Sequence, residues 1–252
     1  MKDALFFHKR QAFLRRDHRP YFLKKLHLKF QEVYVKHFLR PQLESLGPDF
    51  TFMKPWHVEL FGSPITIGKC VNVIATSDNR VRLSIWPMKS NSGRIKIGDY
   101  CLICPGVRIG CAQEIIIEDN CMIASNAYIT DSDWHDLYNR IAGGRTAPVQ
   151  IEKNAWIGDS AIICKGVTIG ENSIVGAGSV VTGSIPPNTI AAGNPARVIK
   201  SLDSSEKITT RDAWFSNPAR LSGEIDLLDR SNLEGNTMLH WIRHRLFPRA
   251  GE

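Results

Sequence analysis

The sequence predicts an all-β core built as a parallel β-helix of hexapeptide repeats, with α-helical extensions on both its N-terminal and C-terminal sides. Three observations predict it. An aliphatic residue recurs every six positions from 151 to 181, mostly small residues stand four positions after each of them, and the same spacing appears upstream. A period of six excludes an α-helix, whose buried stripes recur at about 3.6 residues, and also one long strand, which alternates with period two. Hexads are typical of short strands joined by tight corners, three hexads to a coil.

Residues 1–60 are expected to form a basic, helical N-terminal segment. The apolar residues Leu23, Leu26, Phe30 and Val33 follow the three-four spacing of an amphipathic helix, and prolines at 20 and 41 mark its boundaries. Residues 1–40 contain 11 Lys/Arg and 3 Asp/Glu, a net of +8, so the rest of the chain carries +7 − 8 = −1. Two readings stay open: the helices pack on their own protein with a solvated basic face, or they lie on an anionic membrane surface.

The β-helix domain is expected over residues 61–200. Its inward positions are aliphatic and fall in three runs: Ile97, Ile103, Ile109; Ile117, Ile123, Ile129; and Ile151, Ile157, Ile163, Ile169, Val175, Val181. The glycines that follow, Gly158, Gly170 and Gly176, are expected to supply the backbone angles of the corners. Cys101 and Cys121 stand where the repeat requires small buried residues, which favours core positions over a zinc site.

The repeat is interrupted between Ile129 and Ile151, where we expect a protruding loop over residues 130–150. This loop holds His135, the only histidine between His57 and His240, among Asp131, Asp133 and Asp136. Residues 201–252 are not repeat. They are expected to form a helical extension whose last helix ends before Pro248.

Several functional classes are excluded. No apolar run approaches the ~20 residues of a transmembrane helix, and the opening "MKDALFFHKR" predicts no signal peptide. Six cysteines without a secretory signal favour a reducing cytoplasm. A zinc hydratase with three histidine ligands does not fit one histidine between residues 58 and 239, and the aspartates lack the ligand spacing of a calcium loop. We therefore expect no metal, and no nucleic-acid partner, because no recognition motif is present.

The stretch "IEKNAWIGDSAIICKGVTIGENSIVGAGSVVTGSIPPNTIAAGNPARVIK", residues 151–200, resembles the C-terminal half of hexapeptide-repeat acyltransferases, among them the galactoside, maltose and capsule-sugar O-acetyltransferases. The resemblance implies that the β-helix is left-handed. It also implies a homotrimer with three active sites between neighbouring rods, and acetyl-CoA as the co-substrate.

In that family an extended loop carries a catalytic histidine, and the matching position here is His135. Trp134 stands before it and shifts it by one residue relative to many relatives, and Gly183 stands where relatives usually have lysine or arginine. The resemblance places the acyl-CoA along five residues of the groove between rods: Trp156, Ala177, Thr182, Arg197 and Lys200.

Transfer of an acyl group from a thioester to a hydroxyl requires a base, and histidine, with an unperturbed pKa near 6.5, suits that role at neutral pH. We expect Asp133 to orient the imidazole, and Asp131 and Asp136 to bind sugar hydroxyls, although the sequence does not rank the three. The expected function is an acetyl-CoA-dependent O-acetyltransferase acting on a sugar or surface-glycan precursor, cytoplasmic or peripheral at the inner membrane. Two alternatives stay open: a xenobiotic or amino-sugar N-acyltransferase of the same fold, and a non-catalytic trimeric scaffold that binds partners through its basic helices.

Overall fold

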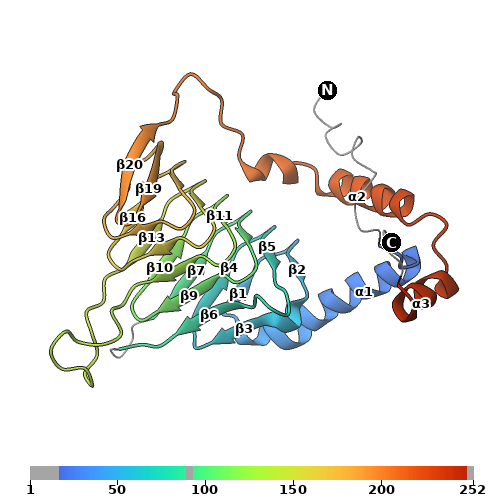
Figure 1. Cartoon of the computed structure of the whole chain (residues 1–252), viewed down its shortest axis with the longest axis horizontal. Coiled ribbons are helices and arrows are strands. Elements are labelled where there is room, and N and C mark those ends of the chain that lie inside the picture. Colours follow the sequence, from blue (N-terminus) through green and yellow to red (C-terminus); the bar gives the residue numbers. More distant parts are fainter. Residues whose placement is uncertain (1–16, 89–92, 249–252) are drawn as a thin grey trace. The chain divides into compact units, whose positions relative to one another are not determined.

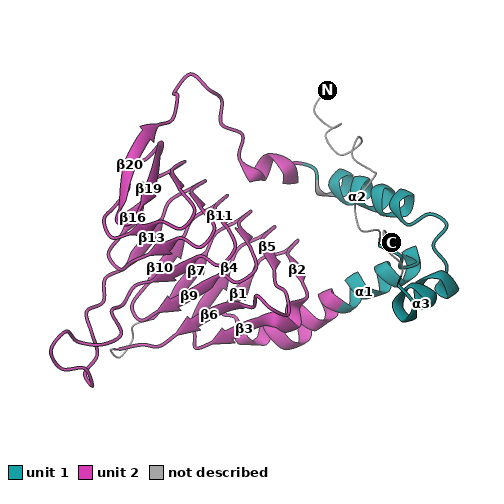
Figure 2. Cartoon of the chain, in the orientation of Figure 1, with its two compact units in different colours: residues 1–30, 217–252 teal, residues 31–216 magenta. Residues whose placement is uncertain are grey.

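The computed structural model describes residues 17–88 and 93–248. They fall into two compact units, one of residues 1–30 and 217–252 and one of residues 31–216 (Figure 2). The larger unit is a left-handed parallel β-helix; the hexads predict the β-helix, and the family resemblance implies its hand. Each coil contributes one short strand to each of three parallel sheets (Figure 1).

We name the sheets A, B and C in the order in which each coil visits them. Sheet A contains β1 (Ser45–Leu46), β4 (Ile65–Ile67), β7 (Ile95–Ile97), β10 (Ile115–Ile117), β13 (Val149–Ile151) and β16 (Thr168–Ile169). Sheet B contains β2 (Thr51–Met53), β5 (Asn72–Ile74), β8 (Leu102–Ile103), β11 (Met122–Ile123), β14 (Trp156–Ile157), β17 (Ile174–Val175), β19 (Thr189–Gly193) and β20 (Ala196–Ser201). Sheet C contains β3 (Val58–Phe61), β6 (Val81–Ile85), β9 (Arg108–Cys111), β12 (Tyr128–Thr130), β15 (Ile162–Ile163) and β18 (Val180–Val181).

The core consists of aliphatic ladders that run along the rod axis. In sheet A, Ile67, Ile97, Ile117, Ile151 and Ile169 lie in register on successive strands and are almost completely buried. Each fully buried isoleucine contributes roughly 1.5–3 kcal/mol relative to an exposed one. The stacked hexads therefore supply the cohesion that isolated two-residue strands lack.

The small-residue position is also a ladder. Cys101, Cys121, Ala155 and Ser173 are completely buried. The Cys101 thiol donates to the Glu118 carbonyl at 3.0 Å, and the Cys121 thiol to the Glu152 carbonyl at 3.1 Å. The two cysteines are core residues, as their place in the repeat predicts.

The three glycines that were expected to supply the backbone angles of the corners have a different role. Gly158, Gly170 and Gly176 do not have positive φ. They are needed because a Cβ would meet the next coil: at Gly170 it would lie 2.3 Å from the nitrogen of Pro187. Several positive-φ corners are occupied by asparagine, which visits this region more readily than other residues with a Cβ. They include Asn120, Asn154, Asn172 and Asn188.

The rod begins earlier than residue 61, because β1, β2 and β3 already form a complete coil. Their sequence does not follow regular hexads, so the spacing does not reveal them. Helix α1 (Tyr21–Tyr34) starts directly after Pro20 and continues into a π-helical turn over Val35–Leu39 and a 3₁₀ turn over Arg40–Gln42. Val35 and Leu39 join the core and close that end of the rod. A further 3₁₀ turn spans Pro55–His57.

After β20 the chain returns along the rod. A 3₁₀ turn at Arg211–Phe215 docks on the corner between sheets A and B, where Arg211 donates to the Tyr100 carbonyl and to the Asn72 side chain, each at 2.7 Å. The smaller unit contains the start of α1 together with α2 (Pro218–Asn232) and α3 (Met238–Leu246). Within it, Lys24 pairs with Asp229 at 2.5 Å and Lys25 with Asp226 at 2.7 Å. No helix in the described part of the chain is long and apolar enough to cross a membrane.

Candidate active site

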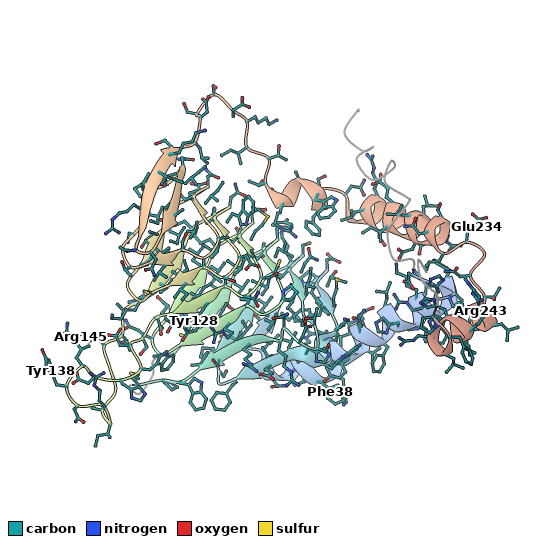
Figure 3. All side chains as sticks on the ribbon, viewed as in Figure 1. Phe38, Tyr128, Tyr138, Arg145, Glu234 and Arg243 are labelled. Carbon is teal, nitrogen blue, oxygen red and sulfur yellow. The ribbon has the colours of Figure 1, made fainter. Side chains whose placement is uncertain are left out.

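The interruption of the repeat forms an ordered arm between β12 and β13, at the edge where sheets C and A meet. It leaves the rod as two paired segments: Ser132 bridges Thr146 in antiparallel fashion, and the Asp133 amide donates to the Arg145 carbonyl at 3.0 Å. Figure 3 shows the arm extending away from the rod, with Arg145 nearer its base and Tyr138 at its tip. The arm therefore holds its residues in a defined geometry beyond the surface of the rod.

Asp131 anchors the base of the arm. Its carboxylate is completely buried and accepts the backbone N–H groups of Ala112, Gln113 and Glu114 at 2.6–2.7 Å. These bonds occupy the corner of the preceding coil between Ile109 and Ile117, which are eight positions apart instead of six. The expectation that Asp131 binds an acceptor hydroxyl is therefore wrong, because its oxygens point into the protein and are already taken.

The backbone at Trp134 displays the catalytic candidate. The His135 amide donates to the Asp133 carbonyl at 2.7 Å, and Trp134 between them has φ +62°. A bond from residue i+2 to residue i around a positive φ defines a γ-turn of the rare, strained kind. Strained backbone of this sort clusters at functional sites. The His135 side chain is exposed, and among the described residues no hydrogen bond or ion pair holds its imidazole.

The two other aspartates of the arm have defined roles in the single chain. The Asp133 carboxylate accepts from the Lys165 ammonium at 2.7 Å, so it is not bonded to His135 here. Asp136 closes a turn by accepting the amides of Tyr138 and Asn139, both at 2.9 Å. The backbone bond from Asn139, followed by that from Tyr138, lowers the pKa of the Asp136 carboxyl. Asp136 therefore supports the shape of the arm.

A pocket of about 420 Å³ lies on the outer face of sheet C beside the arm, and the sequence pattern did not reveal it. Trp86, Tyr128 and Trp134 form aromatic walls, and the Trp134 indole N–H donates to the Tyr128 hydroxyl at 3.3 Å. Gly110 makes room for the indole, because a Cβ there would lie 3.2 Å from it. The one signal in the sequence was the odd position of Trp134 directly before the histidine.

Two arginines complete this pocket. The Arg108 guanidinium lies over the Tyr128 ring at 4.6 Å from its centroid. Arg82 lies in register with Arg108 on the neighbouring strand and pairs with Glu59 at 2.6 Å. The pocket next to His135 is thus lined by aromatic and basic side chains, whereas the sequence analysis expected aspartates to line the site.

Three of the expected donor residues, Trp156, Arg197 and Lys200, lie on another face of the rod, the outer face of sheet B. Trp156 pairs in register with Ile174, Ile174 with Ile190, and Ile190 with Lys200. Three strand spacings separate Trp156 from Lys200, about 14 Å along the rod. Trp156 is 45% exposed. These two residues therefore line one continuous outward column.

Arg197 shares that face because of a bulge. Lys200 lies opposite Ile190 and Arg197 opposite Ala192, with a register shift between Ile190 and Ala191. Since residues 190 and 192 of a strand point the same way, the extra residue in β20 brings Arg197 and Lys200 to the same side of the sheet. A spacing of three would otherwise have placed them on opposite faces.

Ala177 and Thr182 lie at corners of the last coils, and both are exposed. Ala177 follows β17 in sheet B, and Thr182 follows β18 in sheet C. The two residues are therefore on different edges of the rod, and only Ala177 is at the end of a strand of sheet B, separated from it by Gly176. Among the residues described, no group of three or more His, Cys, Asp or Glu is arranged to hold a metal ion.

Within one chain the expected catalytic and donor residues are apart. His135 leaves the edge between sheets C and A, while Trp156 is central in sheet B. The arm tip exposes apolar side chains to an unusual degree, with Tyr138 96% and Ile141 97% exposed. Exposed apolar side chains grouped on a protruding segment are typical of a surface that contacts a partner.

The repeats match two family models. Residues 148–183 match the bacterial transferase hexapeptide repeat, and residues 94–131 match the hexapeptide repeat of succinyl-transferase. The two matches lie on either side of the arm.

Among curated proteins, the chain is 42% identical to galactoside O-acetyltransferase of Escherichia coli over 95 residues, which is 37% of this chain and 47% of that protein. It is 41% identical over 118 residues to a Saccharomyces cerevisiae protein named as an acetyltransferase, which is 46% of this chain and 60% of the relative. The chain thus spans about half the length of the curated relatives it matches.

Among solved structures, the N-acyltransferase AntD of Bacillus cereus, in complex with dTDP and 3-hydroxybutyryl-CoA, shares the fold with a TM-score of 0.55 at 22% identity. The match covers 78% of this chain and 96% of that one. Repeats, fold and relatives agree: this chain carries the hexapeptide repeat of bacterial transferases, and its β-helix resembles that of the sugar O-acetyltransferases.

Proposed function

We propose that this protein transfers an acetyl group from acetyl-CoA to a hydroxyl of a sugar or surface-glycan precursor, with His135 as the general base. The observation that carries the proposal is the arm. A strained turn at Trp134 displays the exposed imidazole of His135 beside a pocket of ligand size. Within the β-helix, the identity to a galactoside O-acetyltransferase supports the acetyl group and the sugar hydroxyl as the reacting partners.

The reaction needs few groups. The imidazole of His135 accepts the proton of the acceptor hydroxyl while the hydroxyl oxygen attacks the thioester carbonyl carbon. The carbonyl oxygen becomes a tetrahedral oxyanion, which backbone N–H groups stabilise. Collapse re-forms the carbonyl, breaks the carbon–sulfur bond and releases the CoA thiolate, which takes the proton back from the imidazolium. Acyl transfer is complete with the histidine regenerated.

We further propose that the active unit is a homotrimer with each site formed between two copies. His135 projects from the edge between sheets C and A, and the column of Trp156 and Lys200 lies on sheet B. One copy therefore supplies the base and its neighbour supplies the donor groove. In that groove, Trp156 packs against the acyl-CoA, Arg197 and Lys200 meet its phosphates, and Ala177 and Thr182 contribute mainly backbone.

Asp133 is the proposed orienting group for His135 in the assembled site. In the single chain its carboxylate pairs with Lys165. Both side chains are about one-third exposed, and exposed ion pairs of this kind contribute little free energy. The Asp133 carboxylate is therefore free to exchange Lys165 for the imidazole when a donor and an acceptor bind.

The test is acetyl-CoA turnover against sugar, amino-sugar and antibiotic acceptors, with His135→Ala assayed alongside. Removal of a positioned base lowers the rate by roughly 10²–10⁴-fold. Leu227→Ala, a change at an exposed leucine of α2 outside the arm, is the control. Undiminished turnover in His135→Ala overturns the mechanism, transfer to amines alone assigns an N-acyltransferase, and no turnover with any acceptor favours a scaffold.

The proposed location is the cytoplasm, with the smaller helical unit as the part that would meet a membrane surface. All six cysteines are free thiols, which suits a reducing compartment. Phe22 and Leu26 of α1, and Leu239 and Leu246 of α3, are exposed next to lysines and arginines, as in helices that lie on anionic lipid. Co-sedimentation with anionic vesicles at low salt tests this location, and no binding contradicts the membrane contact.

A further inference from the structure

The pocket beside the arm continues into a second pocket, and the two share a pair of arginines. The first, of about 420 Å³, has the aromatic walls described above. The second, of about 350 Å³, is polar and includes Ser77, Asn79 and Asn126 in its lining. Arg82 and Arg108 line both. Each pocket has the size of a small-ligand site, roughly 300 Å³ or more, so together they form a groove for an extended ligand.

The aromatic part suits the faces of sugar rings. Trp86 is 54% exposed and stacks on Phe61, with ring centroids 4.1 Å apart and an interplanar angle of 23°. Phe61 therefore braces the indole in one orientation while leaving its other side open. The negative face of an aromatic ring attracts the polarised C–H groups on the apolar face of a sugar. Trp134 adds a second indole close to His135.

The polar part suits hydroxyl groups. The side chains of Asn79 and Asn126 offer both amide donors and carbonyl acceptors, and the Ser77 hydroxyl offers both as well. Sugar hydroxyls are also donors and acceptors. A stacking surface followed by a set of mixed donors and acceptors, in one groove, is what an oligosaccharide requires of its site.

The charged side chains that line the groove predict the sign of the ligand's charge. Arg80 and Arg82 both pair with Glu59, each at 2.6 Å, so their charges are partly neutralised. Arg108 lies over the ring of Tyr128, and no carboxylate in the described part of the chain forms an ion pair with it. Asp78, in the polar pocket, is the one acidic residue among the described residues that line the two pockets. Arg108 therefore stands at the junction of the two pockets as an arginine ready for an anion.

We propose that the acceptor is an acidic saccharide of at least two sugar units, which lies across both pockets and places a carboxylate or phosphate on Arg108. The inference rests on the proposed function, because it assigns the acceptor of that reaction. An acceptor in the aromatic pocket presents a hydroxyl next to His135. The next unit along the glycan reaches the polar pocket.

Binding is measured first without any acyl donor, by tryptophan fluorescence of the full chain. The probes are oligogalacturonides of two and three units, neutral galacto-oligosaccharides of the same lengths, and galactose 1-phosphate. We expect the acidic oligomers to bind about tenfold more tightly than the neutral ones, as one charge-assisted contact provides. Galactose 1-phosphate has one sugar unit and one anion, so it tests whether the anion alone is enough; binding as tight as that of the acidic oligomers overturns the requirement for two units.

Arg108→Gln should abolish the preference for acidic oligomers, and Trp86→Ala should weaken both acidic and neutral ones. Arg220→Gln is the matched control, because it removes the same charge from an exposed arginine of α2. Thermal unfolding verifies that each variant is folded. Equal binding of neutral and acidic oligomers, or an unchanged preference in Arg108→Gln, overturns the inference.

Different experimental outcomes contradict the acidic acceptor and the acyl-transfer reaction. Acetyl transfer to a small neutral sugar, unaffected by Arg108→Gln, contradicts the acidic acceptor and leaves the acyltransferase intact. Arg108-dependent binding of acidic oligomers without transfer to any acceptor contradicts the reaction and leaves the glycan site.

Discussion

The indole nitrogen of Trp134 lies 3.3 Å from the hydroxyl oxygen of Tyr128 and donates a hydrogen bond to it. Tyr128 belongs to strand β12, on the rod, and Trp134 belongs to the arm, directly before His135. The bond thus fixes the strained turn to the rigid sheet. The position of the imidazole depends on the rod through this contact, the Asp133–Lys165 ion pair and the two paired segments at the base of the arm.

Tyr128→Phe removes the acceptor of that bond and keeps the ring under Arg108. A typical hydrogen bond contributes roughly 0.5–1.5 kcal/mol, so we expect kcat to fall about threefold to tenfold while KM for acetyl-CoA stays unchanged. Steady-state kinetics measure both. Tyr138→Phe is the matched control, because that ring is at the exposed tip, and an equal loss in both variants would contradict the role of the Trp134 contact.

Asp131→Asn should destabilise the fold. Its buried carboxylate accepts three backbone N–H groups, and the amide that replaces it turns a donor toward donors. We expect a loss on the order of 2–4 kcal/mol in the free energy of unfolding, measured in urea. Asp133→Asn breaks only a partly exposed pair with Lys165 and should cost under about 1 kcal/mol. Equal stability of the two variants would show that the base of the arm does not need its carboxylate.

The smaller unit should loosen in acid. Hydrogen bonds from Lys25, Tyr21 and Arg230 hold the pKa of Asp226 far below its ordinary value of 3.8. A depressed folded-state pKa contributes stability above the unfolded value, and this contribution is lost as the pH falls through the folded pKa. The protection of the α1 and α2 amides, measured as the exchange rate relative to the intrinsic rate at each pH, should therefore be constant near neutral pH and fall below about pH 4.

Asp226→Asn should remove most of that acid sensitivity and give faster exchange at neutral pH. Asp203→Asn changes an acid whose partners are local to its own turn and is the control. An Asp226→Asn variant with the same acid profile as the unaltered protein would assign the transition to other groups.

The arm tip should be needed for assembly. Tyr138→Ser and Ile141→Ser together remove two almost completely exposed apolar side chains. We expect the trimer to dissociate in sedimentation velocity experiments, with loss of turnover, because the donor groove and the base then belong to separate molecules. Leu227→Ser, an exposed leucine of α2, is the matched control. A trimer that survives the double change, at equal concentration, would place the subunit contact elsewhere.

Most of the β-helix could be predicted from the amino-acid sequence. Ile151, Ile157 and Ile163 lie on three different sheets, and each points to the common axis. The reason is local: each side of a coil is one hexad long, so every sixth residue points inward. The arm could be located too, as the place where that spacing stops, and so could α1 and α3, which follow from their prolines. The first coil could not, since β1 to β3 obey no hexad.

The sequence by itself determined the repeat, its inward faces and the segment that carries His135, because those follow from a local period. Only the tertiary structure decided which neighbours those residues meet. It buried Asp131 under residues 112–114, brought Trp86, Arg108 and Tyr128 into one pocket, and aligned Trp156 with Lys200. Those partners come from different coils or from a bulged strand. Strand register, rather than spacing along the chain, sets which side chains share a face.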